Sequence, residues 1–215
     1  MFLSYLVTSH NETDSLEKLL SKLSENKKHN HEIVLVDDYS DNPETIKIID
    51  KYKSQISFYQ HKLERNYGAH KNYGIEQCKG EWIFQLDADE YPTDALLQNI
   101  NEVIESNNIN EVIWLPRLNY FKGVTEQDIS MWGWNYNDGM INFPDYQSRL
   151  YRNRPHIRYE RRLHEKVEGF KSYSFVPPQK DYAIVHEKTI EKQRQTNLNY
   201  NKMFTQEENK GYAVK

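Results

Sequence analysis

Short apolar segments alternate with helix-like segments through the first half of this chain. Expected strands, rich in β-branched and aromatic residues, cover residues 2–7, 31–38, 56–59, 81–87 and 111–116. Expected helices lie between them, at residues 14–26, from Pro43 onward, at 68–79 and at 94–106. Repeated strand–helix units with unbroken apolar strands are typical of a mostly parallel sheet covered on both faces. The sequence therefore predicts an α/β fold.

Local signals support individual helices. Leucines recur at helical spacing in the first one, at positions 16, 19, 20 and 23. Asn42 followed by Pro43 is a favourable cap and first position for the second helix. Gly80 is placed to end the third helix.

Polar residues stand where three of the expected strands end. These ends are Thr8-Ser9-His10, Asp37-Asp38 and Asp87-Ala88-Asp89. In parallel sheets, ligands bind beyond the carboxyl ends of the strands. Since these three ends point in one direction, we expect them to form one site.

The pattern loosens after Pro116. Residues 117–147 hold several aromatic side chains, Trp132 and Trp134 among them, without a sustained period, which is typical of a binding loop or lid. Further strands are expected at 148–152 and 182–186, followed by a polar surface helix from Glu187. Without repeats or a linker, the 215 residues are expected to form one domain.

Composition excludes several classes of protein. A net charge of -4 argues against a nucleic-acid binder. The lone Cys78 excludes an intramolecular disulfide framework and a cysteine-rich zinc site, and favours a reducing compartment. The first residues lack the charged region of a signal peptide, and no window reaches the roughly 18–20 apolar residues of a membrane span. We expect a soluble, cytoplasmic protein with no integral membrane segment.

The acidic cluster of Asp87, Asp89 and Glu90 has three interpretations. A calcium loop is disfavoured, because Pro92 stands where that pattern needs glycine. The acids can be solvated caps of the helix that begins near Thr93. Alternatively, they hold a divalent ion that binds a diphosphate, since Mg²⁺ and Mn²⁺ combine one or two carboxylates with phosphate oxygens.

Residues elsewhere favour the divalent ion. His186 ends a late strand and can add an imidazole ligand that suits Mn²⁺. Arg65 and Lys71 lie where a loop enters a helix, a place suited to an anion. The chain contains no G-x-G-x-x-G after its first strand and no Walker pattern, which argues against a dinucleotide enzyme or a P-loop NTPase.

In their joint order, several motifs resemble those of inverting family 2 glycosyltransferases of the GT-A fold, closest to the short lipopolysaccharide-core type. They are VTSHNE (7–12), IVLVDDYSD (33–41), RNYGAHKNYGIEQCKGEWIFQLDADE (65–90), RLYRN (149–153), RRLHE (161–165) and VHEK (185–188). The resemblance implies a single Rossmann-like GT-A domain with a small acceptor-side β region and a C-terminal helix. Its nucleotide-sugar-binding half would be residues 1–116, its acceptor half 117–186 and its helical tail 187–215.

The resemblance also implies roles in binding a UDP-sugar donor. Asp38 would accept the uracil N–H, and Lys71 would lie against the base or diphosphate. Asp87 would reach the ribose and a metal-bound water. The remaining expected donor-binding residues are Thr8, Ser9, His10, Glu12, Arg65 and Ala88.

A Mn²⁺ or Mg²⁺ ion would be bound by Asp89 and His186, with Asp87 as a further metal residue. Glu165 is the best match for the general base that activates an acceptor hydroxyl on a glycan or another compound, with the adjoining His164 as the alternative. Glu165 can also be a surface acid paired with Arg161 or Arg162.

Two other functions share parts of this pattern. A sugar nucleotidyltransferase usually has a Gly-rich basic loop after its first strand, whereas this chain has TSHNET (8–13). A nucleotide-sugar-binding or glycan-binding protein without turnover would keep Asp87 and Asp89 but would need no general base.

Overall fold

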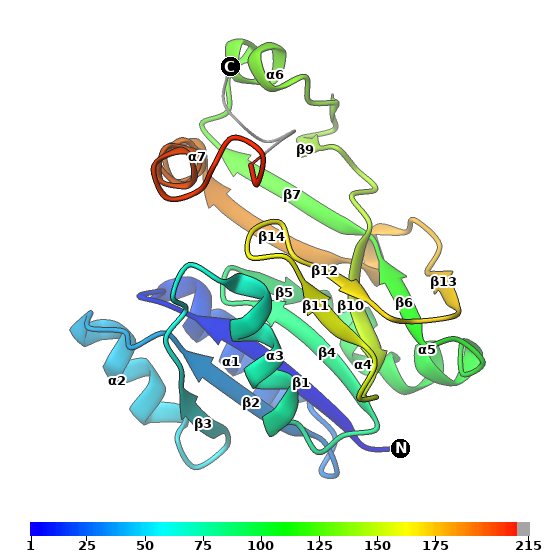
Figure 1. Cartoon of the computed structure of the whole chain (residues 1–215). Helices are drawn as coiled ribbons and strands as arrows, with labels where there is room; N and C mark the ends of the chain where they lie inside the picture. The colour runs from blue at the N-terminus through cyan, green and yellow to red at the C-terminus, as the bar shows by residue number, and fades with distance from the viewer. Residues whose placement is uncertain (210–215) are drawn as a thin grey trace.

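The structure is a computed structural model and describes residues 1–209. Seven strands form its central sheet: β1 (Leu3–Ser9), β2 (Glu32–Asp37), β3 (Ser57–Gln60), β4 (Trp82–Asp87), β6 (Val112–Leu115), β10 (Gln147–Arg152) and β13 (Tyr173–Phe175). Their order is β13-β6-β10-β4-β1-β2-β3 (Figure 1). All pairings are parallel except those of β10, which runs antiparallel between β4 and β6. The expected mostly parallel α/β sheet is confirmed.

Both faces of this sheet are covered, as the strand–helix alternation predicts. One face packs against α1 (Asp14–Asn26), α2 (Pro43–Tyr52), α4 (Asp94–Gln98) and α5 (Ile100–Ser106) (Figure 1). The other packs against α3 (Tyr67–Gln77) and the hairpin of β11 (Arg158–Glu160) and β12 (Lys166–Glu168). The four leucines predicted to face the core from the first helix are fully buried. Asn42 caps α2, its side chain accepting the Glu44 N–H at 2.9 Å.

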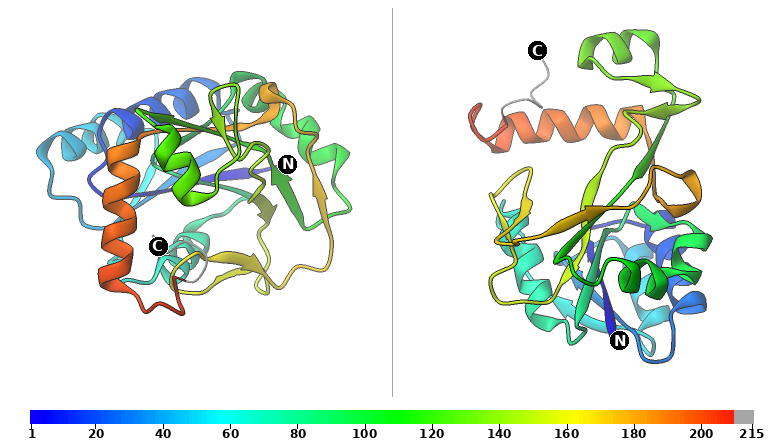
Figure 2. Two further views of the ribbon diagram at one scale, coloured as in Figure 1. Left: turned by 90° about the horizontal axis from the view of Figure 1, so that it is seen from above. Right: turned by 90° about the vertical axis from the view of Figure 1, so that its right-hand side faces the viewer.

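A second sheet of five strands stands beyond the carboxyl end of β4. It has the order β5-β14-β7-β9-β8 and consists of β5 (Glu90–Pro92), β7 (Arg117–Lys122), β8 (Tyr136–Asn137), β9 (Met140–Ile141) and β14 (Ile184–Thr189). Helix α6 (Glu126–Trp132) follows β7, and a 3₁₀ turn (Lys180–Tyr182) precedes β14. The last helix, α7 (Ile190–Met203), lies beyond the start of α3 and the tip of the hairpin (Figure 2).

Four local expectations are wrong. Residues 94–106 form two helices that meet at Asn99, and the stretch 117–147 contains β7, α6, β8 and β9 rather than an irregular loop. Lys188 belongs to β14 and not to the surface helix. Gly80 does not cap α3, because the cap is Cys78. A Cβ at position 80 would lie 2.5 Å from the Ser4 nitrogen, so the glycine is needed for close contact with β1.

No helix within residues 1–209 combines the length and the apolar character that crossing a membrane requires. The cytoplasmic location stays a prediction.

The contact between α3 and the hairpin positions the loop 161–165. The Asn72 side chain bonds both backbone groups of Tyr159, accepting from its nitrogen and donating to its oxygen at 2.8 Å each. At the start of α3, the Tyr67 nitrogen donates to the Arg162 oxygen at 2.9 Å. Gly68 allows this approach, because a Cβ there would lie 2.4 Å from the Arg161 oxygen.

Replacing Gly68 by alanine is therefore expected to lower the free energy of unfolding by about 1–2 kcal/mol. Overpacking costs about 1–3 kcal/mol, which exceeds the roughly 1 kcal/mol that alanine contributes inside a helix. Urea unfolding measures the change. The control is Ala69→Ser at the exposed neighbouring position, which is expected to stay within about 0.5 kcal/mol of the wild type. A Gly68→Ala protein as stable as the wild type would show that the contact is not tight.

Candidate active site

The carboxyl ends of β1, β2 and β4 meet at one edge of the sheet, as predicted. Thr8 is the register partner of Asp87, and Ser9 is that of Asp37. The backbone continues this pairing past the strands, since the Ala88 nitrogen donates to the Thr8 oxygen at 3.1 Å and the Asp38 nitrogen to the Ser9 oxygen at 2.9 Å. Main-chain hydrogen bonds thus hold the expected donor residues on β1 next to those that follow β2 and β4.

Asp87 is bound by two cations. Its Oδ1 lies 2.9 Å from Lys71 Nζ, and its Oδ2 lies 2.6 Å from an Arg149 guanidinium nitrogen. Thr8 Oγ1 also donates to Oδ1, at 3.2 Å. Burial alone would raise the pKa of Asp87, but the charges of Arg149 and Lys71 lower it well below the usual range. The carboxylate is therefore ionised at neutral pH and fixed in orientation.

Lys71 connects Asp87 to Glu165. Its side chain is 4% exposed, and its ammonium lies 2.6 Å from Glu165 Oε1. Burial would lower the pKa of Lys71, but the charges of Asp87 and Glu165 raise it, so the ammonium stays charged. This lysine bonds two carboxylates rather than lying open to a nucleotide.

Glu165 and His164 have different surroundings. Glu165 points to Lys71, whereas His164 Nε2 lies 2.9 Å from Asn209 Oδ1, and the ring meets Tyr200 edge-on. Burial is the main cause of the lowered pKa of His164. Both residues belong to the loop that α3 holds in place, but Glu165 is the one that is linked to Asp87.

Arg149 ties the first half of the chain to the second. It lies on β10 with its side chain 8% exposed, and its guanidinium bonds the Gln85 side chain, Asp87 and the Glu90 carboxylate, the last at 2.8 Å. Glu90 is 1% exposed and also pairs with Arg117 at 2.7 Å. Burial would lower the pKa of Arg149, but Asp87 and Glu90 raise it far above the usual value. These buried charges are compensated by one another.

Strand β5 brings Asp89 and His186 together. It begins directly after Asp89 and pairs with β14, with Glu90 and His186 as register partners. As a result, His186 Nε2 lies 3.5 Å from Asp89 Oδ2. Burial would raise the pKa of Asp89, but the close approach of His186 and the charges of Lys188 and Lys192 lower it. The expected approach of these two residues is present.

The tautomer of His186 follows from its other neighbour. Its Nδ1 lies 2.8 Å from Asn119 Oδ1. The Asn119 amide nitrogen donates to Asp145 Oδ2 at 2.8 Å and to the Ile141 oxygen at 3.3 Å, which fixes its oxygen toward the histidine. Nδ1 therefore carries the proton, and burial lowers the pKa of His186, which favours the neutral ring. The Nε2 lone pair then faces the Asp89 carboxylate.

Helix α7 contacts both the Asp89–His186 pair and the start of α3. The Lys192 ammonium pairs with Glu12 and lies 3.8 Å from Asp89 Oδ2. Farther along the helix, the Tyr200 ring meets Tyr67 at the start of α3 edge-on, with 5.9 Å between centroids. Helix α7 thus extends from the Asp89–His186 pair to the start of α3.

The remaining expected donor residues border the loop after β2. Asp38 Oδ1 accepts the Leu63 N–H at 2.9 Å, and the Asp38 carbonyl oxygen lies 2.7 Å from His10 Nδ1. Ser9 Oγ is buried and has no partner within residues 1–209. Arg65 is exposed in the loop that leads into α3, with a φ of 56°.

Within residues 1–209, no three His, Cys, Asp or Glu side chains gather closely enough to hold a metal ion. Asp89 and His186 form a pair, while the Asp87 carboxylate is directed to Lys71 and Arg149. The three expected metal residues are therefore not assembled as one cluster.

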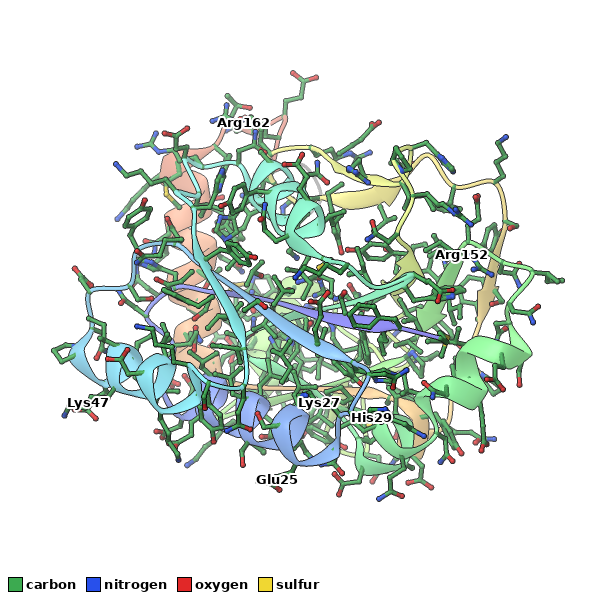
Figure 3. The ribbon with its side chains drawn as sticks, turned by 90° about the horizontal axis from the view of Figure 1, so that it is seen from below. Glu25, Lys27, His29, Lys47, Arg152 and Arg162 are labelled. Carbon is green, nitrogen blue, oxygen red and sulfur yellow. The ribbon has the colours of Figure 1, made fainter. Side chains whose placement is uncertain are left out.

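The basic run from 149 to 171 is not one patch. Arg149 is buried, Arg152 stacks over the Trp82 ring at 4.6 Å, and Arg162 lies 3.6 Å from Glu208. Figure 3 shows Arg152 and Arg162 well apart, with Arg162 near the end of α7. These residues serve separate local contacts.

Sequence reasoning gave no role in the site to Gln85, Asn119 or Lys192. A signal was present for Gln85, since a polar residue within an otherwise apolar strand needs a polar partner. Arg149 carried a similar signal within SRLYR (148–152). Asn119 had none, because its role depends on the pairing of β7 with β14.

The family model named Glycosyl transferase family 2 matches residues 4–177. The chain belongs to this family. The GT-A fold expected from the resemblance is confirmed by a solved structure, Staphylococcus aureus TarS 1-349 in complex with UDP-GlcNAc, with a TM-score of 0.58 and 20% identity over 87% of this chain and 58% of that one. The expected likeness to the short lipopolysaccharide-core type stays a prediction.

Curated relatives include two kinds of transferase. Poly(ribitol-phosphate) beta-N-acetylglucosaminyltransferase TarP of Staphylococcus aureus is 29% identical over 116 residues, 51% of this chain and 35% of TarP. An undecaprenyl-phosphate 4-deoxy-4-formamido-L-arabinose transferase of Pseudomonas savastanoi is 42% identical over 95 residues, 41% of this chain and 28% of the relative. This chain thus spans about a third of the length of these relatives.

Replacing Arg149 by methionine is expected to lower the free energy of unfolding by about 3–5 kcal/mol, because it leaves the buried Glu90 carboxylate with one cation fewer. Guanidinium unfolding measures the loss. The double variant Arg149→Met/Glu90→Gln is expected to recover part of it. The control is Arg154→Met on the exposed surface, which is expected to change stability by less than about 0.5 kcal/mol. An equal loss of stability in Arg149→Met and Arg154→Met would contradict the role of the network.

Proposed function

We propose that this chain is an inverting glycosyltransferase that moves a sugar from a UDP-sugar to an acceptor hydroxyl. The observation that carries the proposal is the Asp89–His186 pair. There, a carboxylate oxygen and an imidazole lone pair face each other at 3.5 Å, both as acceptors. Two acceptors at this distance repel unless a proton or a metal cation lies between them. A carboxylate with an imidazole is a donor set that Mn²⁺ accepts, and Mg²⁺ commonly takes one or two carboxylates with phosphate and water.

The residues present therefore fit a divalent ion, with Asp89 and His186 as its protein ligands. When bound, such an ion neutralises charge that develops on a departing diphosphate, and a unit-charge pair at ~4 Å contributes about 4 kcal/mol at an effective dielectric near 20. Asn119 would orient His186 for this task by accepting a hydrogen bond from Nδ1–H. Asp87, held by Lys71 and Arg149, is placed to bind the ribose or a water beside the ion.

Glu165 is the proposed general base. It would take the proton of the acceptor hydroxyl as the oxygen attacks the anomeric carbon, and a positioned base of this kind contributes about 10²–10⁴-fold to the rate. One base with direct in-line attack inverts the anomeric centre. The Lys71 contact keeps the Glu165 carboxylate in a fixed direction before the acceptor arrives. His164, which lies against Asn209, is the weaker candidate.

The UDP-sugar donor is supported by family membership and by TarS, which was solved with UDP-GlcNAc. Asp38 would accept the uracil N–H, with Thr8, Ser9, His10 and Glu12 along the same edge. Arg65, exposed at the entry to α3, would approach the donor from the loop, and buried Ala88 would keep β4 against β1. The curated relatives are named for poly(ribitol-phosphate) and undecaprenyl-phosphate, which supports an acceptor of anionic character.

UDP is expected to bind this protein at least tenfold more weakly in EDTA than in Mn²⁺, because the ion joins the diphosphate to Asp89 and His186. Asp89→Asn should abolish the metal effect, and His186→Ala should weaken it less, since water can replace one ligand. Calorimetric titration checks both. Asp50→Asn, an exposed acid on α2, is the matched control. Metal-independent UDP affinity in the wild type would refute the proposed ion site.

Replacing Glu165 by glutamine is expected to lower turnover of a UDP-sugar by about 10²–10⁴-fold, with UDP affinity unchanged within twofold. The donor is first selected by a thermal-shift screen of nucleotide sugars, because ligands that bind the native state raise its melting temperature. Glu168→Gln, on the same hairpin but exposed, is the control and should keep full activity.

The same assay separates the other functions. Donor binding without turnover in the wild type would indicate a binding protein. Release of pyrophosphate from a nucleoside triphosphate would indicate a nucleotidyltransferase. Loss of activity in His164→Gln but not in Glu165→Gln would move the base to the histidine.

A further inference from the structure

One face of the second sheet continues away from the Asp89–His186 pair. Strands β7 and β14 are parallel, and their register pairs His186 with Asn119 and Lys188 with Phe121. Side chains two positions apart on a strand share a face. Lys188 and Phe121 therefore stand on the face from which His186 reaches Asp89, one step farther toward α6.

Lys188 carries a charge that the protein does not neutralise directly. Its ammonium lies 4.9 Å from the centroid of the Phe121 ring. Within the described part of the chain it makes no ion pair and no hydrogen bond. The other two lysines of the site, Lys71 and Lys192, each pair with a carboxylate. Apart from the electrostatic attraction of Asp89, this half-buried cation has only a ring as direct neighbour, which costs free energy that a bound anion would offset.

The Phe121 ring beside this cation belongs to a cluster of aromatic side chains. The Trp134 ring meets Phe121 edge-on, with 5.4 Å between centroids, and Trp132 lies 4.4 Å from Trp134. The Trp132 indole N–H is buried and has no acceptor within residues 1–209. The cluster thus offers apolar ring faces together with two donors that lack acceptors. A sugar presents apolar C–H faces and acceptor oxygens, and a phosphate on it would supply the missing anion.

We propose that Lys188, Phe121, Trp132 and Trp134 form a subsite for an acceptor sugar that carries a phosphate group. The proposal rests on the proposed transferase function and adds the chemical class of the acceptor. The position favours the acceptor over the donor: all four residues come from the second half of the chain, and the subsite extends from His186 away from the Asp87 edge. Lys188 would bind the phosphate and the rings would bind the sugar, leaving a free hydroxyl directed to Glu165.

The test uses the full chain saturated with UDP and Mn²⁺, so that the donor position is filled. Calorimetry then compares glucose 6-phosphate with glucose, and glycerol 3-phosphate with glycerol. The wild type is expected to bind each phosphorylated probe at least tenfold more tightly than its neutral partner. Lys188→Met should remove this preference while changing the affinity for UDP much less, and Lys188→Arg should keep most of it.

Two further variants complete the design. Lys122→Met, an exposed lysine next to Phe121, should keep the preference for phosphate. Trp134→Leu should weaken the phosphorylated probes while the protein remains folded by circular dichroism. The proposal is overturned if the wild type shows no preference for phosphate, or if Lys188→Met lowers UDP affinity and leaves the probes unchanged. Failure of the transferase function is read separately, as absence of UDP binding or of donor turnover.

Discussion

The charge network around Arg149 is the interaction on which the rest of this structure depends. The buried Glu90 carboxylate that follows β4 would be costly alone, and Arg149 compensates it together with the partly exposed Asp87. Glu90 in turn holds Arg117 at the start of β7. One guanidinium thus fixes the direction of the Asp87 carboxylate and the place where the second sheet begins. Within residues 1–209, the site is built around ion pairs and not around a cluster of three metal ligands.

Rigid elements carry the chemistry in two separate ways. The Asp89–His186 pair depends on β5, three residues that join the end of β4 to β14. The Glu165 loop depends on α3, through the Asn72 contacts with Tyr159 and the close approach at Gly68. Lys71 then links the two sides, since it bonds Glu165 and Asp87. A change at either support would move one reactive group relative to the other.

Sequence reasoning reached the sheet, its covering helices and the convergence of Thr8, Asp38 and Asp87, because these follow from periodicity and from the geometry of parallel strands. It did not reach β5, because three residues are too short for a period and their strand character comes from pairing with β14. The antiparallel direction of β10 was equally hidden, as direction is set by the connection and not by composition. The partner of Lys71 depends on a hairpin some ninety positions later in the chain, which no local pattern encodes.

The position of β10 has a consequence for how such a protein can change. Residues 147–152 belong to the expected acceptor half, yet they lie between β4 and β6 in the middle of the sheet whose edge carries the expected donor residues. The two halves are therefore interlocked, and no hinge can separate them without breaking a central strand. Large ligands must then enter and leave through movement of α7 and the surface loops. Evolution can alter acceptor preference by replacing those loops, but not by exchanging whole halves between relatives.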